Sequence, residues 1–186
     1  MSNSYLRGVK IIGGKWRGKR LKVLNEKNLR PSSSRTRETL FNWLAPHISG
    51  AVCLDLFSGS GALAFESLSR GAKWVTMIDH DKNIAEDLAR KSREMAPKCS
   101  EVVLSDSLTW LAAPQKKKFD IVYLDPPFED DCINRVLFAL TNGWLTVDAL
   151  IYVEQTEGNF NLPTNWKIKK FSKTAKVAYA LLANNV

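Results

Sequence analysis

The stretch Val52-Cys53-Leu54-Asp55-Leu56-Phe57-Ser58-Gly59-Ser60-Gly61 decides the fold class of this chain. Its first half is a short apolar run that predicts a buried strand, and its second half predicts a tight glycine turn. Residues 62–70 follow with the pattern of a helix. A strand, a glycine turn and a helix in succession bring backbone N–H groups and a positive helix end to a ligand. This arrangement is typical of an α/β sheet that binds an adenosine-containing cofactor.

Strand-like and helix-like segments alternate along most of the chain. Strands are predicted at 52–56, 74–79, 101–105, 120–125 and 149–155, and helices at 62–70, 82–94, 107–111 and 131–140. Such alternation predicts a mostly parallel sheet covered by helices on both faces, a Rossmann-like α/β fold. Two further runs, 166–171 and 176–182, have no helix between them. They predict a terminal antiparallel hairpin.

The first fifty residues have a different pattern. Residues 8–24 alternate around Gly13-Gly14 and predict a small β-hairpin with basic side chains on one face. A helix is expected from Ser34, its candidate N-cap, to about Leu44. Its apolar stripe would hold Leu40, Phe41 and Leu44. We therefore expect an N-terminal extension over 1–48, followed by the α/β domain over 49–186.

The composition indicates one ordinary globular unit with a small appendage. The chain has 186 residues, of which 45% are hydrophobic and 25% charged. No apolar run approaches the roughly 20 residues that cross a bilayer, and the first residues lack the apolar core of a signal peptide. Three separated cysteines form neither a disulfide framework nor a zinc-binding pattern. We expect a cytoplasmic protein that acts as a monomer, without a metal and without contact with a membrane.

The positive charge is concentrated at one end. Residues 1–50 hold eleven Lys or Arg against two acidic residues, whereas the remainder holds sixteen against seventeen. A basic end favours a polyanionic partner, although a solvated basic surface would give the same count. The residues that suit phosphate contact and stacking on an unpaired base are Lys15, Trp16, Arg17, Lys19, Arg20, Arg30, Arg35 and Arg37. The alternative is a core position for Trp16 and solvated cations.

The glycine turn is compatible with two cofactors. Residues 59–64 fit the nicotinamide pattern G-x-G-x-x-A, and Asp79 ends the second strand. There it can bind ribose hydroxyls, or it can be a helix cap or a surface turn residue. Asp55 favours S-adenosylmethionine, because a carboxylate there suits a methionyl ammonium and would repel a pyrophosphate. Asp106 can accept from the adenine amine or cap the helix at Ser107. The predicted cofactor residues are Asp55, Phe57, Ser58, Gly59, Gly61, Asp79 and Asp106.

The segment Asp125-Pro126-Pro127-Phe128 follows the fourth predicted strand. Its two prolines remove two N–H donors and impose an extended, rigid turn. Such a turn can present a carboxylate and a carbonyl that hold an exocyclic amine, while Phe128 stacks on the base. The alternative is a plain loop. The segment predicts transfer of a methyl group to an amine nitrogen, with positioning as the main source of catalysis.

The chain resembles the RsmD-type methyltransferases, which methylate guanine N2 in bacterial small-subunit ribosomal RNA. The resemblance rests on the motifs at 11–18, 30–44, 54–61, 125–128 and 177–182. It implies a class I S-adenosylmethionine-dependent methyltransferase that acts on 16S rRNA or a small ribosomal subunit, with 1–48 as the RNA-binding extension. The chain departs from the family at Lys10 (usually arginine), Asp79 (usually glutamate) and Ala175 (usually glycine).

Three other functions share parts of these patterns. A DNA adenine-N6 methyltransferase also uses Asp-Pro-Pro with an aromatic residue, but a large target-recognition insert would be expected. A catalytically inactive RNA-binding module would keep the fold, yet Asp125, Gly59, Gly61 and Asp79 are intact. A nicotinamide-dependent dehydrogenase is the most distant alternative.

Overall fold

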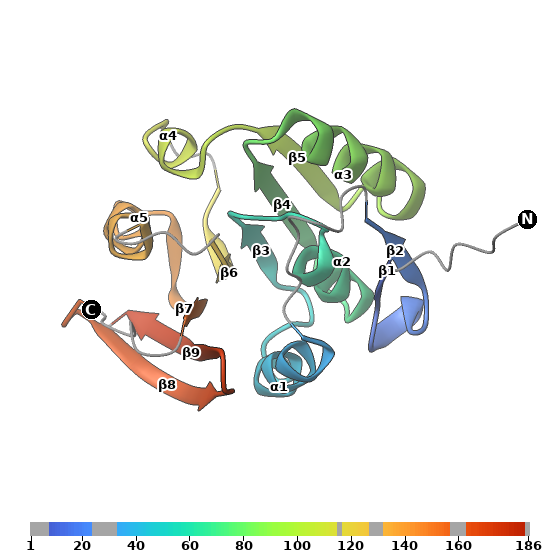
Figure 1. Cartoon of the computed structure of the whole chain (residues 1–186). Coiled ribbons are helices and arrows are strands. Elements are labelled where there is room, and N and C mark those ends of the chain that lie inside the picture. Colours follow the sequence, from blue (N-terminus) through green and yellow to red (C-terminus); the bar gives the residue numbers. More distant parts are fainter. Residues whose placement is uncertain (1–7, 24–32, 115–116, 127–131, 157–162, 185–186) are drawn as a thin grey trace, which may run out of the picture.

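The central element of the computed structural model is a seven-stranded sheet (Figure 1). The structure describes residues 8–23, 33–114, 117–126, 132–156 and 163–184. The strands lie in the order β5 (Ser100–Leu104), β4 (Trp74–Asp79), β3 (Val52–Asp55), β6 (Phe119–Leu124), β7 (Leu145–Thr156), β9 (Val177–Asn184) and β8 (Trp166–Lys173). Neighbours from β5 to β7 are parallel, whereas β9 is antiparallel to both β7 and β8. The predicted mostly parallel sheet with a terminal hairpin is confirmed.

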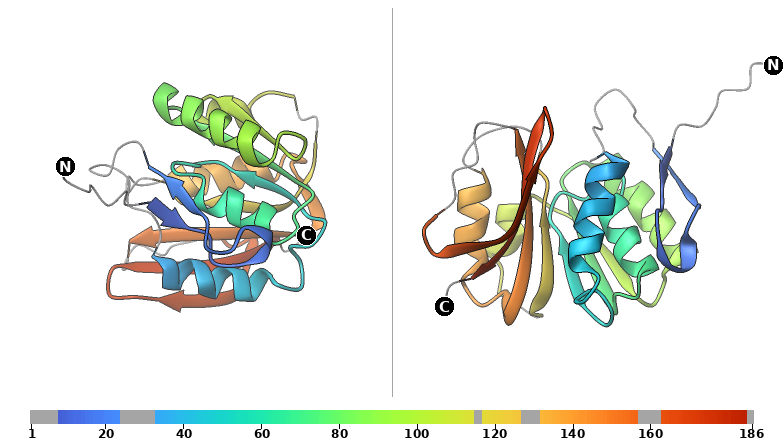
Figure 2. Two further views of the ribbon diagram at one scale, coloured as in Figure 1. Left: turned by 90° about the vertical axis from the view of Figure 1, so that its right-hand side faces the viewer. Right: turned by 90° about the horizontal axis from the view of Figure 1, so that it is seen from below.

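Helices cover both faces of the sheet (Figure 2). One face carries α1 (Ser34–Leu44), α2 (Ala62–Ser69) and α3 (Lys82–Met95), and the other carries α4 (Ser107–Leu111) and α5 (Cys132–Leu140). None of the described helices is long and apolar enough to span a bilayer. The predicted strand at 149 begins four residues earlier, at Leu145. The polar Thr146 and Asp148 interrupt the apolar run there, and Val147 and Asp148 are exposed, so a search for a buried apolar run misses the first part of β7.

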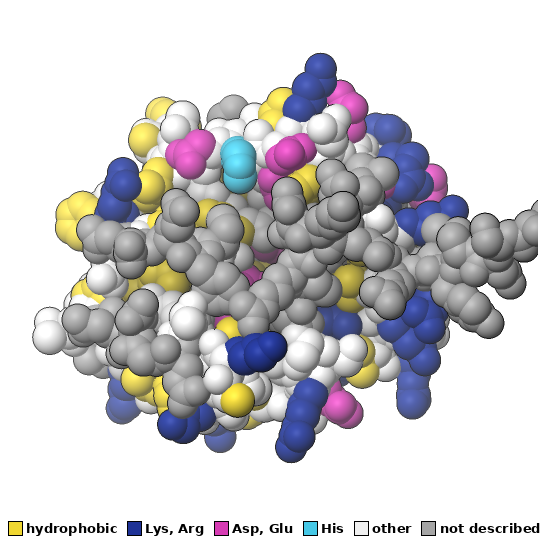
Figure 3. Space-filling model, in the orientation of Figure 1, with side chains coloured by type: hydrophobic (Ala, Val, Ile, Leu, Met, Phe, Trp, Pro, Cys, Tyr) yellow, Lys and Arg dark blue, Asp and Glu magenta, His cyan; other side chains and the backbone are white. Residues whose placement is uncertain are grey.

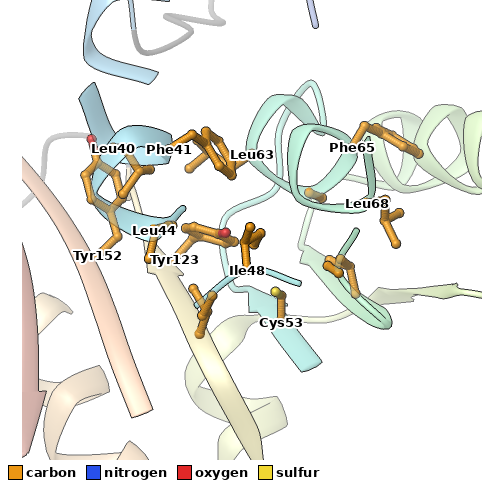
Figure 4. Close-up of a cluster of buried hydrophobic side chains, with 14 of the residues drawn as sticks. Leu40, Phe41, Leu44, Ile48, Cys53, Leu63, Phe65, Leu68, Tyr123 and Tyr152 are labelled. Atoms are coloured by element: carbon orange, nitrogen blue, oxygen red, sulfur yellow. The ribbon is translucent and has the colours of Figure 1, made fainter. Parts of the chain in front are cut away.

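Along the central strands of the sheet, side chains alternate between two hydrophobic clusters. Cys53, Tyr123 and Tyr152 face the cluster under α1 and α2 (Figure 4). Their neighbours Leu54, Val122 and Ile151 face the cluster under α4 and α5. Within a regular strand, a residue two or four positions after Cys53, Tyr123 or Tyr152 therefore points to the same face, the one that carries α1 and α2.

The N-terminal hairpin forms as predicted. Strands β1 (Gly8–Lys10) and β2 (Arg20–Lys22) are antiparallel and flank a 3-10 turn, η1 (Gly14–Trp16). Val9 and Leu21 pair on the buried side, and Lys10 and Arg20 pair on the exposed side. The hairpin therefore presents its cations to solvent and its apolar pair to the protein.

Helix α1 also forms, with one correction. Its N-cap is Ser33 instead of Ser34, because the Ser33 Oγ accepts the Thr36 N–H at 3.0 Å. Leu40, Phe41 and Leu44 are fully buried, as predicted.

The N-terminal extension shares the hydrophobic core of the sheet. Ile11, Leu21 and Phe41 belong to the same buried cluster as Val75 in β4 and Tyr123 in β6. The division at residues 48 and 49 stays a prediction. The structure adds that the two parts pack through one continuous core.

Candidate functional site

Acidic side chains lie at the carboxyl ends of four neighbouring parallel strands. Asp79 ends β4, Asp55 ends β3, Asp125 follows β6, and Glu154 is close to the end of β7. Asp55 pairs with Tyr123 and Tyr123 pairs with Tyr152, so Asp125 and Glu154 both lie two residues beyond this level. By alternation their side chains belong to the face that carries α1 and α2. The strands thus bring three of the predicted site residues, Asp55, Asp79 and Asp125, to one edge of the sheet.

The glycine turn is rigid and closely packed. Gly61 is the N-cap of α2 and has a φ of +79°, a backbone angle that residues other than glycine rarely adopt. A Cβ atom there would lie 2.6 Å from Phe65 and 2.8 Å from Leu88. The Ser58 Oγ donates to the Asp55 carbonyl at 2.9 Å, and the Gly61 N–H donates to the Ser58 carbonyl at 2.7 Å. The turn therefore needs glycine at 61 for both its backbone angle and its space.

Asp79 fastens this turn to the end of β4. Its Oδ2 accepts the Gly59 N–H at 2.9 Å, and its Oδ1 accepts the Asp81 N–H at 3.0 Å. The side chain is buried. A carboxylate oxygen can accept more than one hydrogen bond, so these contacts are compatible with the predicted ribose contact. The role as a turn residue has direct support, and the ribose contact stays a prediction.

Asp55 is a buried carboxylate with a perturbed pKa. Burial raises the pKa of Asp55 to about 7; the backbone N–H of Phe57 opposes this shift and the negative charge of Asp79 adds to it. The first turn of α2 also contributes, through a hydrogen bond from the Ala64 N–H. A cation placed beside Asp55 would favour its charged form. The site therefore has the chemistry to bind the ammonium of a methionyl group.

Asp106 is exposed and caps α4. Its Oδ1 accepts the Thr109 N–H at 2.8 Å and the Thr109 hydroxyl at 3.0 Å. The Thr109 N–H lowers the pKa of Asp106, against a smaller effect of burial. The capping role left open by the sequence is thus observed, and the adenine contact stays a prediction.

Asp125 lies next to a buried tyrosine–glutamate pair. The Tyr152 hydroxyl donates to the Glu154 Oε2 at 2.6 Å, and both side chains are buried. Burial raises the pKa of Tyr152 well above its usual value; the charges of Glu154 and Asp125 add to this effect. The predicted catalytic residues Pro127 and Phe128 lie outside the described residues. Glu154 was missed by sequence reasoning, because it shares with Asp125 the place near the end of an apolar strand but not the two prolines that drew attention to Asp125.

The predicted RNA-contacting cations are mostly at the surface. Lys15, Arg17, Lys19, Arg20 and Arg35 are exposed, and Arg30 lies outside the described residues. In Figure 3, Lys and Arg side chains gather on the right, where Figure 1 places β1 and β2. Trp16 is half-buried against the core, with the Lys15 Nζ 4.5 Å from the centre of its ring. Part of the indole therefore packs against the core, which was the alternative to RNA contact considered for Trp16.

Arg37 requires a correction. Its side chain is buried, its Nη1 donates to the Lys10 carbonyl at 3.1 Å, and it lies 3.9 Å from Glu66. Burial lowers the pKa of Arg37, and the charge of Glu66 opposes this effect. The expectation that Arg37 contacts RNA is wrong, because its guanidinium connects α1 to the hairpin inside the protein.

Glu66 is the main anchor of the hairpin, a role that no local pattern in the sequence indicates. The side chain is fully buried and accepts the N–H groups of Ile12 at 2.7 Å and Gly13 at 2.8 Å. It also accepts the Arg70 Nε–H at 2.8 Å. One turn further along α2, the Ser69 Oγ donates to the Gly13 carbonyl at 2.6 Å. Helix α2 thus follows the glycine turn at one end and holds the basic hairpin along its side.

No group of His, Cys, Asp and Glu in the described part of the chain is arranged to hold a metal ion.

Comparisons with known proteins agree with this geometry. Residues 9–183 match the family described as "Conserved hypothetical protein 95". The chain is 46% identical to ribosomal RNA small subunit methyltransferase D of Haemophilus influenzae, over 95% of this chain and 94% of that protein. It is 42% identical to the protein of the same name from Escherichia coli, over 93% and 88%.

Solved structures are similar over nearly the whole chain. An Escherichia coli protein provisionally described as a methyltransferase has a TM-score of 0.86 at 39% identity, covering 96% of this chain and 98% of its own. A Haemophilus influenzae protein provisionally described as a methylase has a TM-score of 0.82 at 40% identity, covering 96% and 99%.

Proposed function

Because the chain belongs to the family of conserved hypothetical protein 95, together with the small-subunit rRNA methyltransferases D, we propose that it methylates the exocyclic N2 amine of a guanine in 16S ribosomal RNA. Its fold is that of the class I S-adenosylmethionine-dependent methyltransferases. The observation that carries the proposal is the position of Asp125, one strand from Asp55 at the same edge of the sheet. This position supports the proposal, because a residue predicted to bind the cofactor would then adjoin a residue predicted to accept from the amine.

The cofactor side uses the residues around the glycine turn. S-adenosylmethionine would supply an electrophilic methyl group. The buried Asp55 carboxylate would pair with the ammonium of the cofactor. Burial disfavours the negative charge of Asp55, as its raised pKa indicates, and a neighbouring cation would stabilise that charge. Asp79 would accept from the ribose hydroxyls beside Gly59, whose N–H it already holds. Asp106 would accept from the adenine amine through its carboxylate at the start of α4.

The base side depends on Asp125. Its carboxylate would accept a hydrogen from the guanine amine and hold the nitrogen towards the methyl group, so that positioning supplies most of the rate enhancement. Phe128 would stack on the base. The guanine must be unstacked or extruded from its helix to reach this edge. The proton of the amine leaves to Asp125 or to water.

The basic extension would hold the RNA. Arg17, Lys19 and Arg20 are exposed on and beside β2, and phosphate contact at these residues releases counterions. Their hairpin is fixed to α2 through Glu66, so the RNA-binding surface has a defined position relative to the cofactor residues. The reaction takes place where bacterial ribosomes are assembled, in the cytoplasm.

A methyl-transfer assay tests the proposal. The protein is incubated with labelled S-adenosylmethionine and, separately, with naked 16S rRNA, assembled small subunits and DNA, and the products are digested to nucleosides. We expect N2-methylguanosine from at least one of the two rRNA substrates. N6-methyladenosine from DNA would indicate the DNA methyltransferase instead. Binding of NADH, without binding of S-adenosylmethionine in calorimetry, would contradict methyl transfer altogether.

A further inference from the structure

Glu154 lies on the far side of Asp125 from the cofactor residues. The strand order β4, β3, β6, β7 places Asp79, Asp55, Asp125 and Glu154 in that sequence along the edge. Adjacent strands are about 4.8 Å apart. With the cofactor over β4 and β3 and the amine at Asp125, the rest of the base extends towards β7. Among the residues that the structure describes, Glu154 is therefore an acidic side chain on the base side of the site.

Tyr152 holds Glu154 in a fixed orientation. Its hydroxyl donates to the Glu154 Oε2 at 2.6 Å, and its ring is fully buried between the sheet and α1. Since burial raises the pKa of Tyr152 well above its usual value, its hydroxyl stays protonated and acts as the donor, with the Glu154 Oε2 as the acceptor. A carboxylate offers about four acceptor positions and can accept several hydrogen bonds at once. The pair therefore presents a pre-oriented hydrogen-bond acceptor beside Asp125.

The Watson–Crick edge of guanine matches two neighbouring acceptors. It carries two donors side by side, the N2 amine and the N1–H, whereas adenine has an unprotonated N1 that would be repelled by a carboxylate. We propose that Glu154 accepts a hydrogen bond from the N1–H of the target base and thereby selects guanine over adenine. This inference rests on the proposed function, because it takes the amine at Asp125 as the methylated group.

A base substitution tests the contact. The methylated guanine is first located in the RNA by mass spectrometry and is then replaced by 2-aminopurine, which keeps the 2-amine but has no N1–H. Because a hydrogen bond to a charged group is removed, we expect kcat/KM of the wild-type protein to fall by roughly tenfold to a hundredfold. The Glu154→Gln variant should be less active on guanine and should distinguish the two bases by less than about threefold. A glutamine can accept from guanine N1–H or donate to the bare N1 of 2-aminopurine.

Matched variants isolate the effect. Asp148→Asn changes an exposed carboxylate on the same strand and should keep the wild-type preference. Tyr152→Phe removes only the hydroxyl that orients Glu154 and should reduce the preference in the same direction with unchanged affinity for S-adenosylmethionine. The 2-aminopurine substitution also removes O6, but this change is common to both proteins, so the two-by-two comparison isolates the coupling between Glu154 and N1–H.

The outcomes are separable. If the wild-type protein methylates guanine and 2-aminopurine equally well, the Glu154 contact is refuted and methyl transfer stands; this arm needs no variant to fold. An undiminished preference in a folded Glu154→Gln protein refutes it equally. If no RNA guanine is methylated at all, the proposed function fails first, and the inference fails with it.

Discussion

Replacing Glu66 by glutamine should loosen the hairpin from α2. The carboxylate accepts two backbone N–H groups and the Arg70 Nε–H, and it lies 3.9 Å from the Arg37 guanidinium. Glutamine keeps one acceptor oxygen and places an NH2 group opposite these donors. A buried N–H that loses its acceptor costs about 1–3 kcal/mol, and removing one partner of a buried ion pair costs about 3–5 kcal/mol. Because Arg37 keeps its bond to the Lys10 carbonyl, we expect a loss of about 3 kcal/mol in the free energy of unfolding.

Urea unfolding followed by circular dichroism measures this loss, and amide hydrogen exchange at Ile12 and Gly13 locates it. A loss of about 3 kcal/mol should lower Tm by roughly 6–12 °C in a protein of this size. Glu86→Gln is the matched control, because Glu86 is on the surface of α3 and its pair with Lys82 spans 3.9 Å; its effect should stay within about 0.5 kcal/mol. If Glu66→Gln were as mild as this control, with unchanged exchange at both amides, the anchoring role would be refuted.

Four further predictions concern the candidate site and the hairpin. Asp125→Ala should keep the affinity for S-adenosylmethionine but slow single-turnover methyl transfer by roughly a hundredfold or more, because the amine loses its positioning; an unchanged rate would leave Asp125 as a turn residue only. Reversing the charges of Arg17, Lys19 and Arg20 should make the plot of log RNA affinity against log salt shallower by about 0.7–0.9 for each phosphate that the variant no longer neutralises, whereas reversal of the exposed Lys73, at the amino end of β4, should not. Since the pKa of Asp55 is raised from 3.8 to about 7, the folded protein binds this proton more tightly than the unfolded chain. Stability should therefore fall as pH rises from about 4 to 7, whereas affinity for the cationic cofactor should rise by up to about tenfold per pH unit and level off above 7. Asp55→Asn should remove both trends in unfolding and calorimetry, and trends that persist in this variant would assign them to another group. Gly61→Ala should destabilise the protein by about 1–3 kcal/mol more than Gly50→Ala, because both glycines have φ near +80° but only Gly61 lacks space for a Cβ; equal destabilisation by the two substitutions would contradict the packing argument.

Much of the fold could be predicted because its signals are local. Strand β4 at 74–79 and helix α4 at 107–111 have the predicted bounds, since each combines a clear pattern with an acidic residue at its boundary. Asp106 explains one of them directly, because it caps α4. The acidic residues of the site were found in the same way, by their place at the ends of apolar strands.

The errors arise where a distant partner decides the role of a residue. Arg37 resembles a phosphate contact when only the arginines near the helix start are considered. Its burial is determined by Lys10 and Glu66, which lie 27 and 29 positions away in the chain. Glu66 itself has the appearance of a surface helix residue, although its partners Ile12 and Gly13 are 54 and 53 positions away. The periodicity of apolar residues predicts which face of a helix or strand is buried. It does not predict which buried charged side chains contact one another.

The position of β9 between β7 and β8 has a consequence for the order in which the site is completed during synthesis. β8 precedes β9 along the chain, yet β9 is the strand with which it pairs in the described sheet. One edge of β7 also stays unpaired until β9 has been synthesised, and on β9 the residue that pairs with Glu154 is Tyr179. In a nascent chain that has emerged only through β8, β8 therefore lacks its partner and β7 has one open edge, and open strand edges are prone to misassociation. The strands that carry Asp55 and Asp79 have their partners earlier, so the cofactor half of the site can form before the half that faces the base.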